Sequence, residues 1–579
     1  MKPAHSTSTF VIAALPLAAL LALGACSKTA ESDRSTTAPV VTTAAAAAPS
    51  TTPVITPASP SSGDSRVDGI AWRNAATDAE VDGAFASARA ENKPVFMWWG
   101  AKWCPPCNQV KATLFNRQDF IERTRAFVPV YVDGDSPGAQ KIGARFHVSG
   151  YPTMVLFNPA GQEVTRLPGE VEPVRYTQVM TLGMNAARPV KAVLADALAG
   201  KAALTPNDWR LLAFYSFDTD QQQVVAKDEL PATLARLAAA CPADPPDTAM
   251  RLRLKALAAR DAKPGTSKKP AAPDEAGRTA VITLLGDVNA SREQTDMITN
   301  YAARLVRAVS APSTPARNDA IAAFDIALRR LEADTTLSRA DRMQALIAQV
   351  DLARIDEPAE DGKPAGTAKP AKATQAKKLD PVLLADVREQ AARADREITD
   401  GYERQAVITA AAYLLEHAGL GAESDVLLKA NLAKSHSPYY LMSELAGNAK
   451  KRGDKAEALD WSRQAFEKSE GPATRLQWGS SYVNALVELA PADEATIEKT
   501  TGQLFDEASK QPDAFYERSG RSLKRVGAKL IAWNEGGRHA AAMARLKTRL
   551  GELCATPKLA ESERATCSGL LSPPAQPSA

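Results

Sequence analysis

Two cysteines separated by two prolines form the stretch of this sequence best suited to chemistry. They lie in the run Trp103-Cys104-Pro105-Pro106-Cys107, after an apolar segment and before a helical pattern. Cysteines at this spacing can alternate between a disulfide and two thiols, and can thereby pass two electrons to the cysteines of another protein. The sequence therefore predicts a dithiol redox site at Cys104 and Cys107.

The segments around this pair predict an α/β domain over residues 67–185. Apolar residues recur at helical spacing in some segments, and short apolar runs bounded by turn residues occupy others. The expected helices cover residues 78–91, 108–115 and 141–146. The expected strands cover residues 95–99, 127–133, 154–158 and 163–167. The cysteines thus follow the first strand and begin a helix, and another helix is expected after the last strand.

This order of elements resembles the thioredoxin fold, and a second motif agrees with it. Gly150-Tyr151-Pro152-Thr153 stands immediately before the third expected strand. In thioredoxin-like proteins a proline at this place follows a cis peptide bond and lies against the two cysteines. The resemblance implies that Trp103, Tyr151 and Pro152 line a groove for an extended substrate chain. The alternative for Gly150-Tyr151-Pro152-Thr153 is an ordinary trans turn.

The match is closer to thioredoxin-like domains of exported proteins, including the C-terminal domain of the disulfide-interchange protein DsbD. It rests on Ile70-Ala71-Trp72, Lys93-Pro94-Val95, Ala101-Lys102-Trp103-Cys104 and Thr113-Leu114-Phe115. By this resemblance Cys104 is the nucleophile at a helix N-terminus, where the helix dipole favours a thiolate. Cys107 then resolves the mixed disulfide.

The residues beside the cysteines have opposing effects on the redox potential. Pro105 and Pro106 begin a helix well, but each lacks an N–H that would stabilise the Cys104 thiolate. Lys102 adds a positive charge, which favours the thiolate. The sequence therefore leaves open whether the site reduces or oxidises its partners.

Two acidic residues that the resemblance implies are missing. Thioredoxins carry a buried aspartate six residues before the first cysteine, where this chain has Trp98. The DsbD-like domain has an acidic residue seven after it, where this chain has Lys111. Glu122 and Asp133 are candidate proton acceptors in their place, but both positions favour solvated surface residues. His147, before the proline motif, is likewise expected to be partly exposed.

The N-terminal residues 1–26 resemble an export signal. The apolar run over residues 10–23 is too short for a comfortable membrane span and ends in Leu23-Gly24-Ala25-Cys26. This tetrapeptide resembles the bacterial lipoprotein cleavage box, which implies a lipid on Cys26. Ser27 in the next position favours the outer membrane, facing the periplasm. The alternative is an ordinary export signal with an incidental cysteine.

The composition after the signal predicts a disordered tether and excludes some function classes. Residues 27–66 are rich in Ala, Thr, Ser and Pro and cannot bury enough apolar surface to fold. The net charge is +3 over 579 residues, and basic residues are scattered, so no nucleic acid partner is expected. No second apolar run reaches membrane-spanning length.

The remaining cysteines predict a structural disulfide and one free thiol. Cys554 and Cys567 lie thirteen residues apart, and their pairing would contribute about 3 kcal/mol in the chain-entropy picture. Cys241 is left over and is expected as a small buried residue on a helix. One CxxC pair with no second pair and no nearby histidine disfavours zinc, and no cofactor is expected.

Helical patterns dominate residues 190–572. Two segments rich in Lys, Pro, Ala and Gly, residues 261–277 and 357–380, are expected linkers. They divide the region into helical segments at 190–260, 278–356 and 381–572.

The last of these segments contains a faint repeat. Leu445-Ala446, Gly453-Asp454, Ala458 and Ala465 approach the small-residue spacing of a tetratricopeptide unit, with Trp478-Gly479 and Tyr482 in another unit and Gly421 at an earlier turn. A generic helical bundle explains the same pattern equally well. Stacked repeats would present a concave surface to a partner.

These observations favour a lipid-anchored, periplasm-facing thiol–disulfide oxidoreductase that acts on protein thiols and disulfides. A membrane redox partner is implied, and the helical region would recruit partners. The main alternative is a scaffold or binding lipoprotein whose redox domain is only weakly catalytic. A disulfide isomerase, which would require a dimer, is a third possibility, and the oligomeric state stays open.

Overall fold

The computed structural model describes residues 69–167, 172–186, 188–200, 204–260, 272–357, 378–556 and 559–572. The expected signal, Cys26 and the tether lie outside the described residues, as do positions 261–271 and 358–377 of the expected linkers. Within the described ranges no helix is both long and apolar enough for a membrane span.

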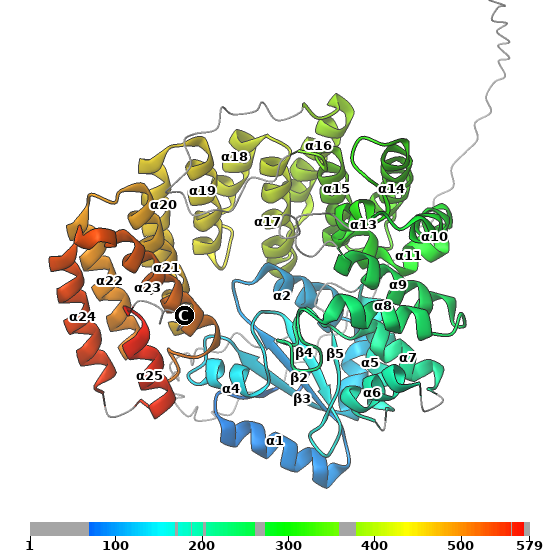
Figure 1. Cartoon of the computed structure of the whole chain (residues 1–579), viewed down its shortest axis with the longest axis horizontal. Helices are drawn as coiled ribbons and strands as arrows, with labels where there is room; N and C mark the ends of the chain where they lie inside the picture. Colours follow the sequence, from blue (N-terminus) through cyan, green and yellow to red (C-terminus); the bar gives the residue numbers. More distant parts are fainter. Residues whose placement is uncertain are drawn as a thin grey trace, which may run out of the picture. The chain divides into compact units, whose positions relative to one another are not determined.

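A five-stranded sheet forms the centre of the N-terminal domain, with the order β1-β3-β2-β4-β5 (Figure 1). Its strands are β1 (Arg73–Asn74), β2 (Val95–Gly100), β3 (Val128–Asp133), β4 (Thr153–Phe157) and β5 (Glu163–Leu167). β3 pairs in parallel with β1 and β2, whereas β4 is antiparallel to both β2 and β5. Every residue of β2 is buried, because the strand is central and both faces of the sheet are covered.

Helices cover both faces of this sheet. They are α1 (Asp78–Glu91), α2 (Pro105–Val110), α3 (Gln118–Arg123), α4 (Ala139–Arg145) and α5 (Pro173–Met184). Short non-α turns follow α2 at η1 (Lys111–Phe115) and α3 at η2 (Thr124–Ala126). Phe96 and Trp98 belong to the core that contains both cysteines, whereas Val95, Met97 and Trp99 belong to the core under α1. Because side chains alternate along β2, one face of the strand packs in the core with the cysteines and the other in the core under α1.

Local sequence explains where these helices begin and end. Thr77 and Glu80 form a reciprocal capping box at the start of α1, and Asn92 ends the helix in a left-handed conformation. The helix that was expected to start at the prolines and continue over 108–115 begins at Pro105, because the two prolines occupy its first positions. It passes into a π-turn at Lys111. α3 has no counterpart among the expected elements.

In the described part of the remaining chain the regular elements are helices, as predicted. Its longer helices are α6 (Val190–Ala199), α7 (Pro206–Phe214), α8 (Leu230–Ala240), α9 (Pro246–Arg260), α10 (Glu275–Gly286), α14 (Pro315–Ala333), α15 (Arg339–Ala353), α16 (Pro381–Glu397), α17 (Gly401–His417), α18 (Gly421–Asn431), α19 (Pro438–Arg452), α20 (Lys455–Lys468), α21 (Pro472–Leu489), α22 (Glu494–Ser509), α23 (Glu517–Trp533), α24 (Ala540–Cys554) and α25 (Glu561–Gly569). Short helices are α11 (Val288–Glu293), α12 (Thr295–Asn300), α13 (Ala302–Val309) and η3 (Glu535–Gly537).

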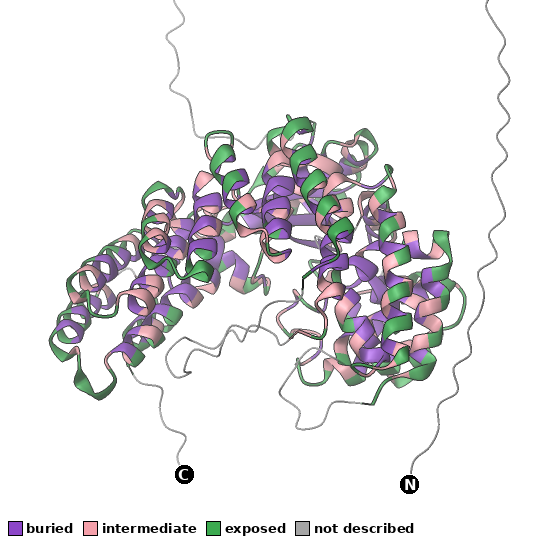
Figure 2. Ribbon diagram, turned by 90° about the horizontal axis from the view of Figure 1, so that it is seen from above, coloured by how far each residue is buried: buried purple, intermediate pink, exposed green. Residues whose placement is uncertain are grey.

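Successive helices pack against each other as hairpins, and buried residues line the sides that face a neighbour (Figure 2). Gly453 joins α19 to α20 with a positive φ of 82°, which favours glycine. The turn expected at Gly421 lies at Gly419, which has a φ of 85°, and Gly421 is the first residue of α18. α10 begins at Glu275, inside the segment expected as a linker, because Asp274 caps it.

Candidate redox site

The two cysteines lie at the start of α2, at the carboxyl end of β2. Cys104 is the N-cap residue, and its Sγ accepts a hydrogen bond from the backbone N–H of Cys107 at 3.2 Å. The two residues form a disulfide with their Cα atoms 5.2 Å apart. A sulfur in this position faces the positive end of the helix, so a thiolate on Cys104 is stabilised when the pair is reduced.

The loop between β2 and α2 is held by a residue that the sequence-based analysis overlooked. Asn108 is fully buried, and its Nδ2 donates to the carbonyl oxygens of Lys102 at 2.9 Å and Cys104 at 2.8 Å. Its position one helical turn after Cys104, on the inner side of α2, is the feature of the sequence that could have identified it. Pro105 and Pro106 have no N–H, so the amide of Cys107 is the first of the helix able to reach the Cys104 sulfur.

The proline motif lies at the same end of the sheet. The Tyr151–Pro152 peptide bond is cis, and Pro152 is buried. The phenol oxygen of Tyr151 accepts a hydrogen bond from Gln140 Nε2 at 3.1 Å. Burial raises the pKa of the Tyr151 phenol, which therefore stays protonated.

Trp98, in place of the expected buried aspartate, belongs to an aromatic cluster beneath the cysteines. Its indole stacks on Tyr131 with ring centroids 4.5 Å apart and meets Phe115 edge to face at 4.8 Å. Lys111 is 7% exposed, and its ammonium lies 5.7 Å from the ring centroid of Trp98 and 4.9 Å from that of Tyr402 in α17. Two aromatic faces therefore stabilise the positive charge of Lys111, which stands where the DsbD-like domain has an acidic residue.

The structure corrects the expectation that Asp133 is a solvated surface residue, because its side chain is half-buried. It ends β3, is the register partner of Gly100, and accepts a hydrogen bond from the N–H of Asp135 at 3.0 Å. Burial raises the pKa of its carboxyl to about 6, Asp135 adds to the rise, and the charge of Lys111 opposes it. Glu122 and His147 are exposed, as expected. Of the two candidate proton acceptors, Asp133 is therefore the one that lies beside β2, the strand that leads to the cysteines.

Trp103 does not line an open groove, because the helical region covers it. Its Nε1 donates to Thr474 Oγ1 at 2.8 Å. Its indole stacks on Tyr440 at 5.9 Å and meets Trp478 edge to face at 5.1 Å. Gln405 in α17 donates to the Trp103 carbonyl oxygen at 3.4 Å. Helices α17, α19 and α21 thus contact the tryptophan beside the cysteines.

The proline loop is covered by the same region. The Arg518 guanidinium lies 5.1 Å from the ring centroid of Trp103 and 5.2 Å from that of Tyr151. Arg521 donates to the carbonyl oxygen of Ser149. Cys104 is only 2% exposed and Cys107 is fully buried. The expected groove is therefore filled by the chain's own helices, which we call the helical cover (α17, α19, α21 and the start of α23).

Lys102 also contacts the helical region. Its side chain is exposed, and its Nζ lies 3.7 Å from a carboxylate oxygen of Glu470. The positive charge expected to favour the Cys104 thiolate is therefore partly balanced by Glu470 and screened by solvent.

The other cysteines lie in the helical region. Cys554 at the end of α24 and Cys567 in α25 form a disulfide with Cα atoms 5.6 Å apart, and both are buried. Cys241 is a free, half-buried thiol at the end of α8, and burial raises its pKa to about 11. In the part of the chain that the structure describes, no group of three His, Cys, Asp or Glu side chains is placed to hold a metal.

Comparison with known proteins agrees with this geometry. Residues 81–182 match the family model described as a thioredoxin-like domain, and with the sheet order and paired cysteines this part of the chain is a thioredoxin-like domain. A large helical region follows it. Over 110 residues the chain is 31% identical to the thiol:disulfide interchange protein DsbD 1 of Pseudomonas aeruginosa, covering 17% of this chain and 18% of that protein.

Comparison gives one further curated relative and one solved structure. The chain is 32% identical over 107 residues to the bifunctional thioredoxin reductase/thioredoxin of Mycobacterium leprae, covering 17% of this chain and 22% of that protein. The solution structure of a thioredoxin from Thermus thermophilus aligns with 20% of this chain and 85% of its own, at 25% identity and a TM-score of 0.18. The chain thus spans less than a quarter of the length of either curated relative.

Proposed function

We propose that this chain is a thiol–disulfide oxidoreductase that exchanges disulfides with protein substrates through Cys104 and Cys107. The observation that carries the proposal is the position of Cys104 at the N-cap of α2, with its sulfur accepting the N–H of Cys107. A helix start of this kind lowers the pKa of a thiol and activates it as a nucleophile.

The reaction needs only the two sulfurs and a proton acceptor. In the reducing direction the Cys104 thiolate attacks a partner disulfide, forms a mixed disulfide and releases one partner thiolate. Cys107 then loses its proton, attacks the Cys104 sulfur and releases the second partner thiolate. Two electrons pass to the partner, and the Cys104–Cys107 disulfide remains. Reversal of both steps oxidises a partner dithiol.

The helical cover must separate from Trp103 before a folded protein partner can reach Cys104, because Cys104 is 2% exposed in the covered arrangement. Trp103 is held by a hydrogen bond to Thr474, ring contacts with Tyr440 and Trp478, and the Arg518 guanidinium over its ring. We propose that partner binding to the helical region accompanies this separation.

Location and anchoring form a separate part of the proposal. By its resemblance to a lipoprotein signal, the segment ending at Cys26 would place the protein at the periplasmic face of the outer membrane, with a membrane protein as redox partner. Mass spectrometry of the mature N-terminus tests this directly: a diacylglyceryl group on Cys26 supports the anchor, and an N-terminus elsewhere without lipid removes it.

The competing function is a binding or scaffold protein in which the dithiol is nearly inactive. The burial of both sulfurs beneath the helical cover favours it. In that case the disulfide would secure the start of α2, and the helical region would carry the function.

Reduction of insulin disulfides separates the two functions. The full chain, made without lipid through Cys26→Ser, is compared with the same chain carrying Cys104→Ser and, as a matched control, Cys241→Ser. Activity lost only in Cys104→Ser supports the oxidoreductase. Equal rates in all three favour the scaffold. A reduction potential of about −270 mV then indicates a reductant, and one of about −120 mV indicates an oxidant.

A further inference from the structure

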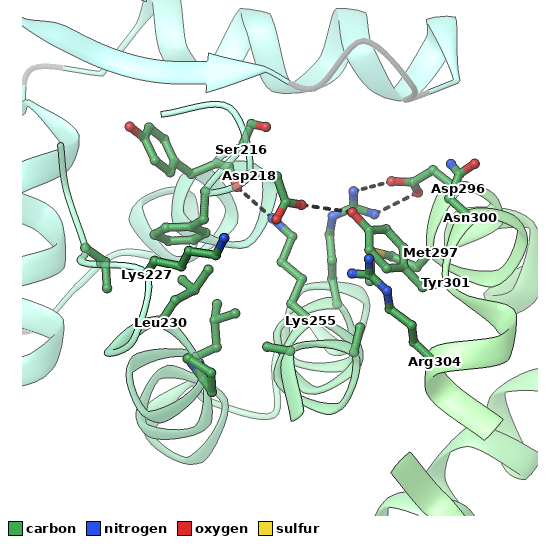
Figure 3. Close-up of a pocket in the computed structure, with 18 of the residues that line it drawn as sticks. Ser216, Asp218, Lys227, Leu230, Lys255, Asp296, Met297, Asn300, Tyr301 and Arg304 are labelled. Carbon is green, nitrogen blue, oxygen red and sulfur yellow. Dashed lines mark hydrogen bonds and ion pairs between the residues drawn. The ribbon is translucent and has the colours of Figure 1, made fainter. Parts of the chain in front are cut away.

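A cavity of about 380 Å³ lies apart from the redox site, between the loop that follows α7 and helices α8, α9, α12 and α13 (Figure 3). One part of its wall is apolar. This part consists of Phe217, Val225, Leu230, Leu234, Ala258 and Met297. Several of these side chains belong to different hydrophobic cores, so the cavity opens where two packed regions meet. Its wall suits the hydrocarbon part of a small ligand.

The acidic groups of the cavity already have partners. Asp296 forms an ion pair with the buried guanidinium of Arg251, with a hydrogen bond of 2.9 Å to Nη1. Asp218 accepts a hydrogen bond from the phenol O–H of Tyr301 at 2.9 Å. Figure 3 shows both pairs beside the cavity. The wall carries four basic side chains, Arg251, Lys255, Lys227 and Arg304, against these two carboxylates, so its net charge is positive.

The remaining cations are Lys255, Lys227 and Arg304. The Nζ of Lys255 points into the cavity and donates to the carbonyl oxygen of Tyr215 at 2.7 Å, which leaves further N–H groups unused (Figure 3). Lys227 and Arg304 are exposed at the cavity. Among the residues that the structure describes, no carboxylate forms an ion pair with any of these three side chains.

Lys255 is the cation that burial affects most, and its ammonium also lies 5.6 Å from the ring centroid of Phe217. Its burial, together with the nearby charge of Arg251, lowers the pKa of the ammonium to about 7. Asp218 and Asp296 oppose this fall but are not sufficient to cancel it. A buried amine in this state lacks a counter-ion, and an anion placed against it would favour the protonated form.

We infer that this cavity binds a small amphipathic carboxylate, with its hydrocarbon chain on the apolar wall and its carboxylate against Lys255. Lys227 and Arg304 at the cavity would attract the anion. The site needs no disulfide chemistry and stands independently of the proposed redox function.

Calorimetric titration with decanoate, decanol and decylamine tests the inference. The protein is the full chain made without lipid, at ligand concentrations below micelle formation. We expect decanoate to bind at one saturable site and at least about tenfold more tightly than decanol, since a charge-assisted hydrogen bond contributes about 1.5–3 kcal/mol. Decylamine should not bind. Equal binding of decanoate and decanol, or no saturable binding of decanoate, overturns the inference.

Variants and pH assign the binding to Lys255. Lys255→Met should weaken decanoate binding by about tenfold or more, whereas Lys191→Met, an exposed control on α6, should not. Decanoate affinity of the wild type should fall as the pH rises above 7, with proton uptake on binding. Lys255→Arg, which stays charged, should bind without this fall. Unchanged affinity in folded Lys255→Met, or pH-independent binding in the wild type, overturns the assignment.

Discussion

The indole Nε1 of Trp103 donates a 2.8 Å hydrogen bond to the hydroxyl of Thr474, although the two residues are 371 positions apart in sequence. The same hydroxyl donates to Asp135 Oδ2 at 2.6 Å, and the Thr474 N–H donates to Asp135 Oδ1 at 2.7 Å. One buried threonine therefore connects the residue beside Cys104 with the loop after β3. We expect the exposure of the redox site to depend on this contact.

Substitution Thr474→Val should make the Cys104–Cys107 disulfide more accessible. It removes the acceptor for Trp103 and one donor to Asp135, and each unsatisfied group destabilises the covered arrangement by about 1–3 kcal/mol. We expect dithiothreitol to reduce the disulfide about tenfold faster, measured by alkylation of the released thiols. Thr548→Val, which replaces an exposed hydroxyl on α24, is the control. Equal rates in wild type and Thr474→Val would show that the helical cover does not limit access.

Substitution Asp133→Asn should change the pH profile of disulfide exchange. With a pKa of about 6, the Asp133 carboxyl is ionised at neutral pH, which is the form able to accept a proton, and it becomes protonated as the pH falls through 6. Single-turnover oxidation of the reduced chain by insulin should therefore slow below pH 6. Asp133→Asn should lack this inflection and react about a hundredfold more slowly at pH 7. Glu122→Gln, the exposed alternative, should behave as wild type; an unchanged Asp133→Asn profile would remove Asp133 from the mechanism.

The same substitution should alter stability with a defined sign. Because folding raises the pKa of Asp133, its ionisation destabilises the folded state as the pH rises from about 4 through 6. Asp133→Asn should therefore raise the free energy of unfolding relative to wild type at pH 8 and leave it nearly unchanged at pH 4. Urea unfolding at the two pH values measures the difference. A variant that is less stable at pH 8 would contradict the assigned pKa shift.

Loss of the second disulfide should weaken the C-terminal helices. Cys554 and Cys567 are buried in the core shared by α24 and α25. Replacement of both by alanine should lower the free energy of unfolding by about 3 kcal/mol, through the entropy of the unfolded chain. Circular dichroism during urea unfolding follows this loss. Replacing both Cys104 and Cys107 by alanine opens a much shorter loop and should lower the free energy of unfolding less. A larger loss in the Cys104/Cys107 variant would contradict the prediction.

Arg166 should be essential for the stability of the sheet domain. Its guanidinium is fully buried, pairs with Glu163 at 3.0 Å, and donates to the carbonyl oxygens of Phe146, His147 and Thr219. Arg166→Met should lower the free energy of unfolding by about 3–5 kcal/mol, because Glu163 loses its charge partner in a mostly buried place. Tryptophan fluorescence during urea unfolding measures this loss, and the exposed Arg89→Met should stay within about 0.5 kcal/mol of wild type.

Local patterns were sufficient to predict most elements of the sheet domain. The helix over 78–91 and the strand over 163–167 have the predicted bounds, because periodic burial and adjacent turn residues define them. α3 was overlooked, since its six residues bury only one side chain fully, Phe120, and leave a weak pattern. The prolines begin α2, as their fixed φ predicts, whereas the π-turn over Lys111–Phe115 could not be predicted from apolar spacing.

The environment of Asp133 could not be predicted from nearby residues. Its position at a strand end suggested solvent, but Lys111 lies close enough to act on its charge, and so does Arg518 of α23. Arg518 follows in the chain several hundred residues later. Burial of a charged group at a strand end depends on what packs above it, and the strand's own pattern carries no information about that partner.

The sequence by itself determined the pair of sulfurs and the sheet that positions them, because spacing, turn residues and apolar periodicity act over a few neighbouring residues. Only the tertiary structure decided that Trp103 contacts α19 and α21, and that Cys104 is hidden from solvent. These contacts join surfaces distant in the chain, and their stability comes from shape and hydrogen-bond complementarity that appears once both surfaces have folded.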